Sequence, residues 1–376
     1  MKKLIATSML LASLVAISGP KADIEKANKL FKENKIAEAV EVLKKSKNTK
    51  GEEAEYERIN YELATRFSNT NEEAISYLKK VAENPKSNSV YAVKANEILV
   101  ANAKTNQEKI KYLEILVSRP NQDTVDFIGY LAALYKAENQ TSKFNELVKK
   151  VEGTKRQDII DNFNLYLGQT LLLELSKESD GLTYLNKAAN STFKNVKSST
   201  YLVYSDYFAV KKDAKKVASY LEYAAQINPD TNTYSIVANR FTTRLGDLKK
   251  AYLYAEKAYK LEPSSKPLLN QVFIYAVANK DSRAEAKYAG LIKKYAKNIG
   301  IADLLYNNRL LEASEKYAKL ALKDNSKEAD LILSSIYGNT GKLDLAITHA
   351  KNAVKNKVEG AQDILNQLEA LKKKAK

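Results

Sequence analysis

The chain has 376 residues, of which 44% are hydrophobic and 28% are charged, and its formal net charge is +16. This composition is ordinary for a soluble protein and supplies enough apolar residues for a sizeable core. Cysteine is absent, which excludes disulfides, thiolate metal sites and cysteine nucleophiles. Because no Pro/Gly/Ser-rich linker divides the sequence, we expect one continuous array rather than separate domains.

Residues 1–18 have the pattern of a secretory signal peptide. Lys2 and Lys3 give a basic start, Leu4–Ile17 is mostly apolar, and Ala16–Ser18 places small residues where a signal peptidase cuts. The alternative is an uncleaved membrane anchor, although about fourteen residues rising 1.5 Å each fall short of a hydrocarbon layer of roughly 30 Å. We therefore expect an exported protein of the periplasm or cell envelope, with no transmembrane segment in the mature chain.

Cleavage after residue 18 would remove two lysines and no acidic residue, which leaves a formal charge of +14. A basic surface of this kind attracts anionic polymers. The alternative is a general lysine bias on solvated helix faces, and the spread of lysines along the whole chain favours that alternative.

A repeating pair of helices is clearest between Thr233 and Pro263. Thr233–Arg244 predicts a first helix because apolar residues recur there at spacings near three and four. Glycine at 246 breaks this helix, since glycine accepts a left-handed turn. Leu248–Leu261 predicts a second helix with a face of small residues, and Pro263 ends the pair because proline cannot continue a helix interior.

Pairs of this layout return about every 34 residues from Ile24 to Val354. A period in this range indicates a stacked array in which each unit buries the apolar face of its neighbour. A last apolar pattern over residues 361–372 predicts a helix that covers the exposed end of the stack.

The layout resembles the tetratricopeptide repeat family. That family places small, turn, alanine, aromatic, alanine and proline residues at fixed positions, and the corresponding residues here are Asn239, Gly246, Ala251, Ala255, Ala258 and Pro263. Ala255 departs from the aromatic preference, which Tyr288 meets in the next unit, and the family's tryptophan is missing. The family's first alanine position in successive second helices falls at Ala39, Ala74, Lys109, Phe144, Gly181, Val217, Ala251, Ala284, Ala313 or Ser314, and Ala346.

The resemblance implies an all-α, right-handed α-solenoid of about ten helix hairpins. We expect degenerate repeats over residues 22–190, better-matched repeats over 198–358, and a capping helix with a basic tail over 359–376. Frequent prolines argue against a bundle or coiled coil, whereas another type of helical solenoid stays open for the degenerate repeats.

Residue patterns for catalysis are nearly absent. His349 is the single histidine, and we expect it to pack on a second helix rather than act as a base. No P-loop, dinucleotide or nucleophile-elbow motif is present. Adjacent carboxylates such as Glu72 and Glu73 fit a helix start capped by Asn71 better than a catalytic pair across a cleft. The sequence predicts no enzyme, cofactor or metal site.

Tyrosine is abundant, with 24 residues and a dense run from Tyr201 to Tyr259. Its apolar ring and polar tip suit protein contacts. The alternative is that most tyrosines fill spaces between alanines of neighbouring helices, and we favour this for Tyr204 and Tyr259.

The resemblance also implies where a partner binds. In the family the concave face consists of first-helix residues that lie off the packing pattern, and the residues that correspond here are Lys136, Tyr166, Asp206, Arg240, Arg244 and Phe273. Arg240 and Arg244 are four residues apart and share a helix face, so they could clamp an acidic group. The alternative is a solvated or locally paired arginine pair.

We therefore expect a non-enzymatic scaffold or assembly factor that binds a protein or peptide of the bacterial cell envelope. The alternative partner is an anionic envelope polymer, peptidoglycan or an acidic polysaccharide, bound through the basic surface. We expect no specific nucleic-acid partner.

Overall fold

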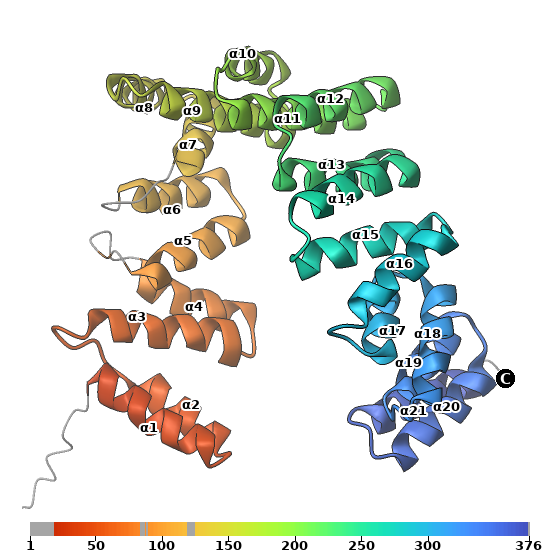
Figure 1. Ribbon diagram of the computed structural model, residues 1–376. Helices are drawn as coiled ribbons and strands as arrows, with labels where there is room; N and C mark the ends of the chain where they lie inside the picture. Colours follow the sequence, from red (N-terminus) through yellow and green to blue (C-terminus); the bar gives the residue numbers. More distant parts are fainter. Residues whose placement is uncertain (1–18, 83–86, 88, 119–124, 375–376) are drawn as a thin grey trace, which may run out of the picture. The chain divides into compact units, whose positions relative to one another are not determined.

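A computed structural model describes residues 19–82, 87, 89–118 and 125–374. The predicted signal peptide, residues 1–18, lies outside the described residues. The regular secondary structure of the described part is helical throughout (Figure 1). The chain divides into two compact units, Met1–Ala188 and Ala189–Lys376, and each is described by itself.

The first unit is a series of helices that pack against their neighbours in chain order. They are α1 (Pro20–Lys32), α2 (Ile36–Lys45), α3 (Glu53–Glu62) continued by the π-helical turn η1 (Leu63–Phe67), α4 (Asn71–Ala82), α5 (Val90–Asn102), α6 (Asn106–Ser118), α7 (Val125–Ala137), α8 (Thr141–Gly153), α9 (Gln157–Gln169) continued by the π-helical turn η2 (Thr170–Glu174), and α10 (Glu178–Ala189).

The second unit continues the same pattern. Its helices are α11 (Lys194–Val210), α12 (Ala214–Ile227), α13 (Thr231–Leu245), α14 (Leu248–Leu261), α15 (Lys266–Ala278), α16 (Ser282–Ile292), α17 (Asn298–Asn307), α18 (Leu311–Lys323), α19 (Ala329–Asn339), α20 (Leu343–Lys355) and α21 (Ala361–Lys374). Odd-numbered helices up to α19 are the first helices of hairpins and even-numbered helices are the second. The described residues thus form ten hairpins and a final helix, which confirms the predicted α-solenoid of about ten hairpins.

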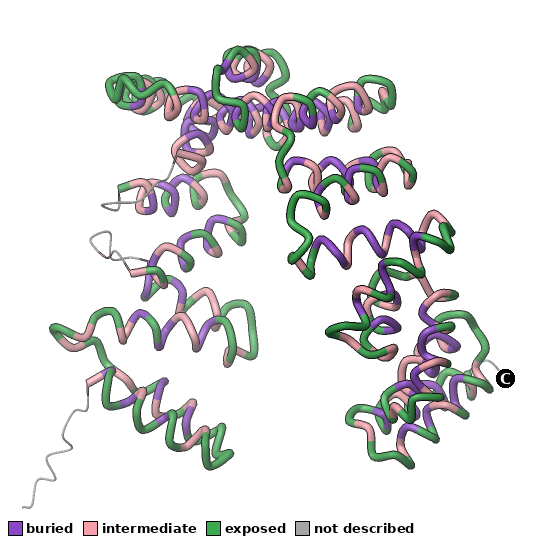
Figure 2. The backbone as a smooth tube through the Cα atoms, viewed as in Figure 1, coloured by how far each residue is buried: buried purple, intermediate pink, exposed green. Residues whose placement is uncertain are grey.

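The core runs between neighbouring hairpins and not at one centre (Figure 2). In the second unit a continuous apolar cluster extends from Leu202 to Leu368. The first unit has more local clusters, such as the one that joins Ala27 and Leu43 to Leu63. Each hairpin therefore hides the apolar side of the next, which is the packing expected of a repeat array.

The family's first alanine position in second helices, as predicted from the sequence, is the fourth residue of nearly every second helix. This holds from Ala39 in α2 to Ala346 in α20, and Ala284 in α16 is the third residue instead. In α18 the fourth residue is Ser314, which is fully buried and donates a hydrogen bond to the carbonyl of Ala302 at 2.7 Å. Of the two residues that the sequence allows at this position, Ala313 and Ser314, the structure places Ser314 there.

Side-chain caps fix where second helices begin. Asp213, Asp247 and Asp281 lie one repeat apart and accept the backbone N–H three residues ahead at 3.1, 2.9 and 2.9 Å. In α4 the cap is Thr70, whose hydroxyl accepts from the N–H of Glu73 at 3.1 Å. The prediction of Asn71 as the cap is wrong, because Asn71 is already the first residue of α4.

An aromatic ladder marks the seventh residue of second helices. It comprises Tyr77, Tyr112, Tyr184, Tyr220, Tyr254, Tyr288 and Tyr317, and His349 occupies the same place in α20. These rings are buried or half-buried. In the unit around Gly246 the seventh residue of the second helix is Tyr254, and the following residue, Ala255, is fully buried. Tyr204 is buried as well, as expected for a packing tyrosine.

The hydroxyl groups of two buried tyrosines each bond a second helix to the second helix of the preceding hairpin. Tyr288 donates to Glu256 at 2.9 Å, and Tyr317 donates to Glu285 at 3.0 Å. Burial and the neighbouring carboxylate raise the pKa of Tyr288 well above its ordinary value. Burial likewise raises the pKa of Tyr317, and Glu285 adds to that shift. The two hydroxyls therefore stay protonated donors throughout the physiological pH range.

The turn within most hairpins contains one residue at positive φ. Gly246 (φ 64°) is glycine as predicted, and Gly341 (φ 75°) serves the last hairpin. Other turns place lysine there, as at Lys212 (φ 58°) and Lys280 (φ 57°). At Gly246 and at Lys280 alike, the N–H of the following aspartate bonds back to the first helix, as in a Schellman turn.

We expect Lys280→Gly to stabilise the protein. A left-handed conformation costs an L-residue about 1–2 kcal/mol, and the greater unfolded-state freedom of glycine takes back roughly 0.5–1 kcal/mol. The free energy of unfolding of the full chain should therefore increase by up to about 1 kcal/mol, and the midpoint of its urea unfolding transition should rise accordingly. The matched change Gly246→Ala should lower stability by about 1 kcal/mol. A fall in the midpoint of Lys280→Gly would contradict this turn geometry.

Candidate functional site

A groove crosses the first helices of the second unit. It has a volume of about 720 Å³ and is formed by α13, α15 and the turn between α17 and α18. This volume lies within the roughly 300–1,000 Å³ that is usual for ligand sites. Its lining residues are all uncharged, and they include the apolar side chains Leu248, Leu268, Ile274 and Leu310. A charge-free groove is notable in a chain with 28% charged residues, because it selects against charged ligands.

Several carboxamide side chains line this groove. Asn239 is exposed, and its side chain makes no hydrogen bond to any residue that the structure describes. Gln271 accepts from the hydroxyl of Ser235 at 2.9 Å and donates to the Ser235 carbonyl at 3.3 Å. Asn308 donates to the carbonyl of Leu304 at 2.8 Å. Each carboxamide has two donor hydrogens and an acceptor oxygen, so these three retain bonding capacity for a ligand. The fourth lining carboxamide, Asn270, accepts from the Tyr295 hydroxyl at 2.8 Å.

The sequence missed the role of Asn239 because it placed that residue at the small packing position of the first helix. The buried small residue is Ala238, with no exposed surface, whereas Asn239 faces the groove. A 3.6-residue period defines a helix face only to within about one residue. Apart from Arg240, Arg244 and Lys266, the residues of α13 and α15 are uncharged, and this scarcity of charge was the signal that could have indicated the groove.

Three of the predicted site residues come together. Arg240 on α13 holds Asp206 on α11 with its Nη2 and Nε atoms at 2.6 and 3.2 Å, and the Nε of Arg244 reaches the same carboxylate at 3.1 Å. The Asp206 side chain is only 14% exposed. This is the locally paired arrangement of the two arginines, and Asp206 already fills the place of an acidic ligand.

The remaining predicted residues have other surroundings. Phe273 is fully buried and packs edge-on against Tyr317, so its assignment to a binding surface is wrong. The reason is that α15 is covered by neighbours on a broad face. Tyr166 is half-buried on α9 against α7, where a Cβ at Gly129 would lie 2.6 Å from the Tyr166 Cβ. Lys136 lies in the first unit and pairs with Asp180 at 3.4 Å.

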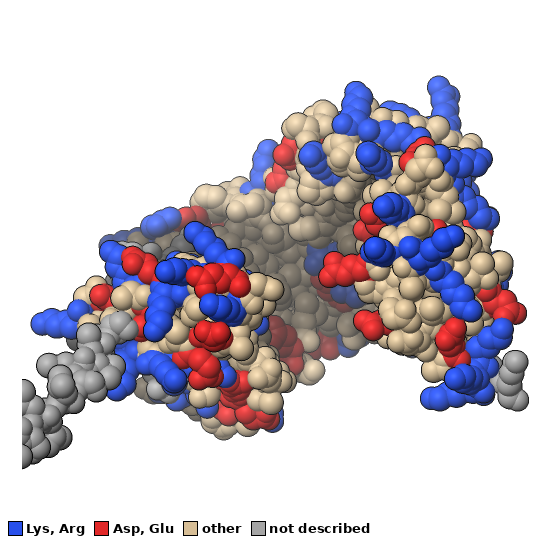
Figure 3. Space-filling view, turned by 90° about the horizontal axis from the view of Figure 1, so that it is seen from below, with Lys and Arg blue, Asp and Glu red and all other residues tan. Residues whose placement is uncertain are grey.

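Basic charge is concentrated on second helices. In the four hairpins from α13 to α20, the first helices together carry three basic and two acidic residues. The second helices of the same hairpins carry eleven basic and five acidic residues. Several of these lysines are paired, as Lys250 is with Glu222 at 2.6 Å and Lys316 is with Glu285 at 2.8 Å. On the face drawn in Figure 3, basic and acidic side chains are interspersed and form no single stripe. The basic excess of the second helices therefore does not gather into one stripe on that face.

The single histidine takes part in packing on α20. The Nδ1 atom of His349 lies 2.7 Å from Asp330, and its ring lies against Tyr337 at 5.4 Å. Within the described residues, no group of three His, Cys, Asp or Glu side chains is placed to hold a metal ion. The described helices include none with the length and apolarity needed to cross a membrane.

No protein-family profile and no curated protein matches the chain. Among solved structures, the APC/C hetero-tetramer Cut9-Hcn1 is similar over 93% of this chain and 76% of that chain, with 15% identity and a TM-score of 0.33. Naa15/Naa10 bound to HypK-THB is similar over 93% of this chain and 59% of that chain, with 16% identity and a TM-score of 0.35. The fold assignment rests on the hairpins described above.

We expect Asp206→Asn to destabilise the second unit. The change removes charged hydrogen bonds to two guanidinium groups and leaves like charges close together, which should cost about 1–2 kcal/mol. The measurement is the shift of the urea unfolding transition. Asp303→Asn on α17 is the matched control, because Asp303 is exposed and forms no ion pair with the described residues. Equal shifts for both variants would show that the Asp206 bridge contributes nothing.

Proposed function

We propose that this protein is a non-enzymatic scaffold that binds a protein partner as an extended, uncharged segment in the groove of α13, α15 and the α17–α18 turn. The observation that carries the proposal is the groove itself, which is apolar, free of charge and interrupted by carboxamides on successive first helices. Apolar side chains with a few oriented polar groups are the usual lining of a binding site.

The spacing of the carboxamides fits an extended main chain. Asn239, Gln271 and Asn308 come from three successive first helices, α13, α15 and α17 with its turn. Packed helix axes lie about 8–10 Å apart, and an extended chain advances roughly 3.3 Å per residue. One helix thus corresponds to about three partner residues. Carboxamides complement both the N–H and the C=O groups of such a backbone.

Charge favours a protein partner over an anionic polymer at this groove. A polyanion requires cations along its path, and the groove lining offers none. The lysines of the second helices are the remaining place for an anionic envelope polymer, but many of them are already paired with glutamates. We therefore keep polymer binding as the second candidate, on the second helices only.

The test uses immobilised peptides of about twelve residues that are either uncharged or acidic. Uncharged peptides should bind the full chain, and affinity should change less than about twofold between 50 and 500 mM salt. Asn239→Ala combined with Gln271→Ala should weaken binding about tenfold or more through lost hydrogen bonds. Ile274→Asp should abolish binding by placing a charge in the groove.

Gln226→Ala is the matched control, because it removes an exposed carboxamide from the second helix α12 outside the groove. It should bind as the unchanged protein does. A preference for acidic peptides, or a steep fall of binding with salt, would contradict the proposal and favour the polymer candidate.

We also propose that the scaffold acts in the bacterial cell envelope, on the basis of the signal-like residues 1–18. Residues 1–25 fused to a reporter enzyme that is active only after export should give activity in a bacterial host. Leu11→Arg should abolish it, because a charge interrupts the apolar run. An inactive fusion, or a Leu11→Arg fusion with unchanged activity, would contradict the export proposal.

A further inference from the structure

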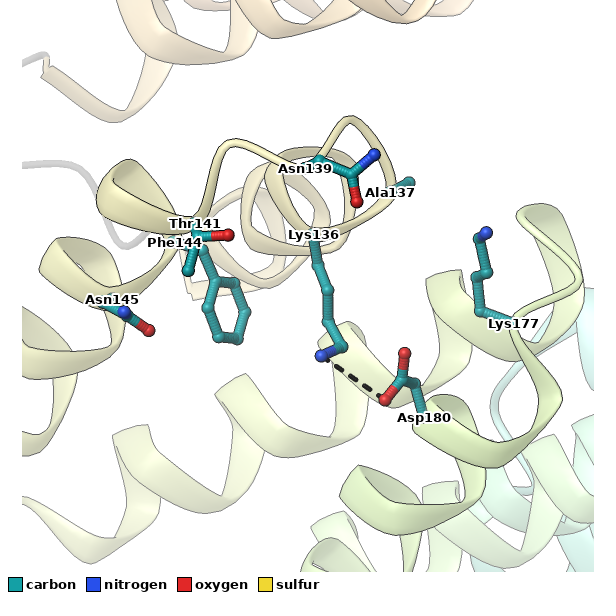
Figure 4. Close-up of a pocket in the computed structure, with 8 residues that line it drawn as sticks. All are labelled: Lys136, Ala137, Asn139, Thr141, Phe144, Asn145, Lys177 and Asp180. Carbon is teal, nitrogen blue, oxygen red and sulfur yellow. Dashed lines mark ion pairs between the residues drawn. The ribbon is translucent and has the colours of Figure 1, made fainter.

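A second cavity lies in the first unit, where the end of α7 and the starts of α8 and α10 meet (Figure 4). Its volume is about 350 Å³. Its polar lining residues are Lys136, Asn139, Thr141, Asn145, Lys177 and Asp180, and the ring of Phe144 forms an apolar part of the wall. This volume is at the small end of the range for ligand sites, which suits a small molecule or a single terminal residue.

The cavity has unused hydrogen-bonding groups. The side chains of Asn139, Thr141, Asn145 and Lys177 form no hydrogen bond or ion pair with any residue in the described part of the chain. A nearby asparagine on the same unit behaves differently, since Asn106 donates to Glu138 at 2.7 Å. Four polar side chains around one hollow, each without an internal partner, offer a ready set of donors to a ligand.

Lys136 is held in place at the centre of this group. Its ammonium lies 5.4 Å from the centre of the Phe144 ring and 3.4 Å from the carboxylate of Asp180. The Asp180 pair is longer than the pair of Lys143 with Glu114 at 2.8 Å, and the Asp180 side chain is 47% exposed. A long and exposed ion pair contributes little to stability, so an incoming carboxylate can replace Asp180.

The lining contains two lysines and one aspartate, so its net charge is positive and favours a ligand with a single negative charge. Asparagine and threonine donors around the lysines suit carboxylate oxygens. The Phe144 ring and Ala137 suit an apolar group beside that carboxylate. We propose that this cavity binds a small monocarboxylate that bears an apolar group, either the C-terminal residue of a peptide or a free organic acid.

The probe is N-acetyl-phenylalanine, and N-acetyl-phenylalanine amide is its neutral counterpart. Titration calorimetry on the full chain should detect the acid, and the amide should bind about tenfold more weakly or not at all because it lacks the charge. Lys136→Gln and Lys177→Gln should each weaken acid binding about fivefold or more. Lys143→Gln is the matched control, since Lys143 on α8 pairs with Glu114 away from the cavity.

Asp180→Asn distinguishes a ligand-binding role of Lys136 from a purely structural one. It removes the internal competitor for Lys136, so acid binding should tighten about threefold or more. Equal binding of 3-phenylpropionate would support a free acid as ligand, and selective binding of the acetylated amino acid would support a peptide terminus. The proposal would be overturned if the acid and the amide bound with equal affinity, or if Lys136→Gln and Lys177→Gln left acid binding unchanged. Stronger binding of inorganic phosphate than of the acid, or weaker acid binding after Asp180→Asn, would overturn it as well.

Discussion

Close approach of second helices to their neighbours is the constraint on which the architecture depends. Ala251, Ala255 and Ala258 form one face of α14 and have no exposed surface. Because alanine adds little bulk, the backbones come near enough for each hairpin to bury the next. This spacing brings the first helices side by side as well, and the uncharged groove exists only because α13 and α15 lie at that distance.

Polar ties reinforce the packing on both layers of the array. Among first helices, Asp206 binds Arg240, Ser235 binds Gln271, and the amide of Asn339 donates to the Tyr306 hydroxyl at 2.9 Å. Second helices use the tyrosine–glutamate bonds instead. The two layers therefore differ in chemistry. The first-helix layer is mostly neutral and keeps free carboxamides. The second-helix layer carries an excess of lysines, of which several pair with glutamates.

Periodicity predicted the array well, including Leu248–Leu261 as the range of α14 and a final helix near residues 361–372. It was less accurate at single residues. Asn239 was placed one position from the buried Ala238, and Phe273 was assigned to a surface although it is buried. The sequence pattern of a helix shows where its apolar face lies, but the width of the buried face depends on the neighbouring helices. The cavity around Lys136 joins three helices and had no signal in the linear spacing.

The caps and ties also determine how the chain can change in length. The Arg244–Asp206 bond joins residues 38 positions apart, and the tyrosine–glutamate bonds of the second helices join residues 32 positions apart. Each of these bonds therefore reaches about one hairpin along the chain. An insertion or deletion of a whole hairpin would break such bonds at the point of change, and equivalent bonds could form between the hairpins that become neighbours. We therefore expect the array to tolerate duplication of the segment that encodes one hairpin, which would add one more first helix to the layer that carries the groove.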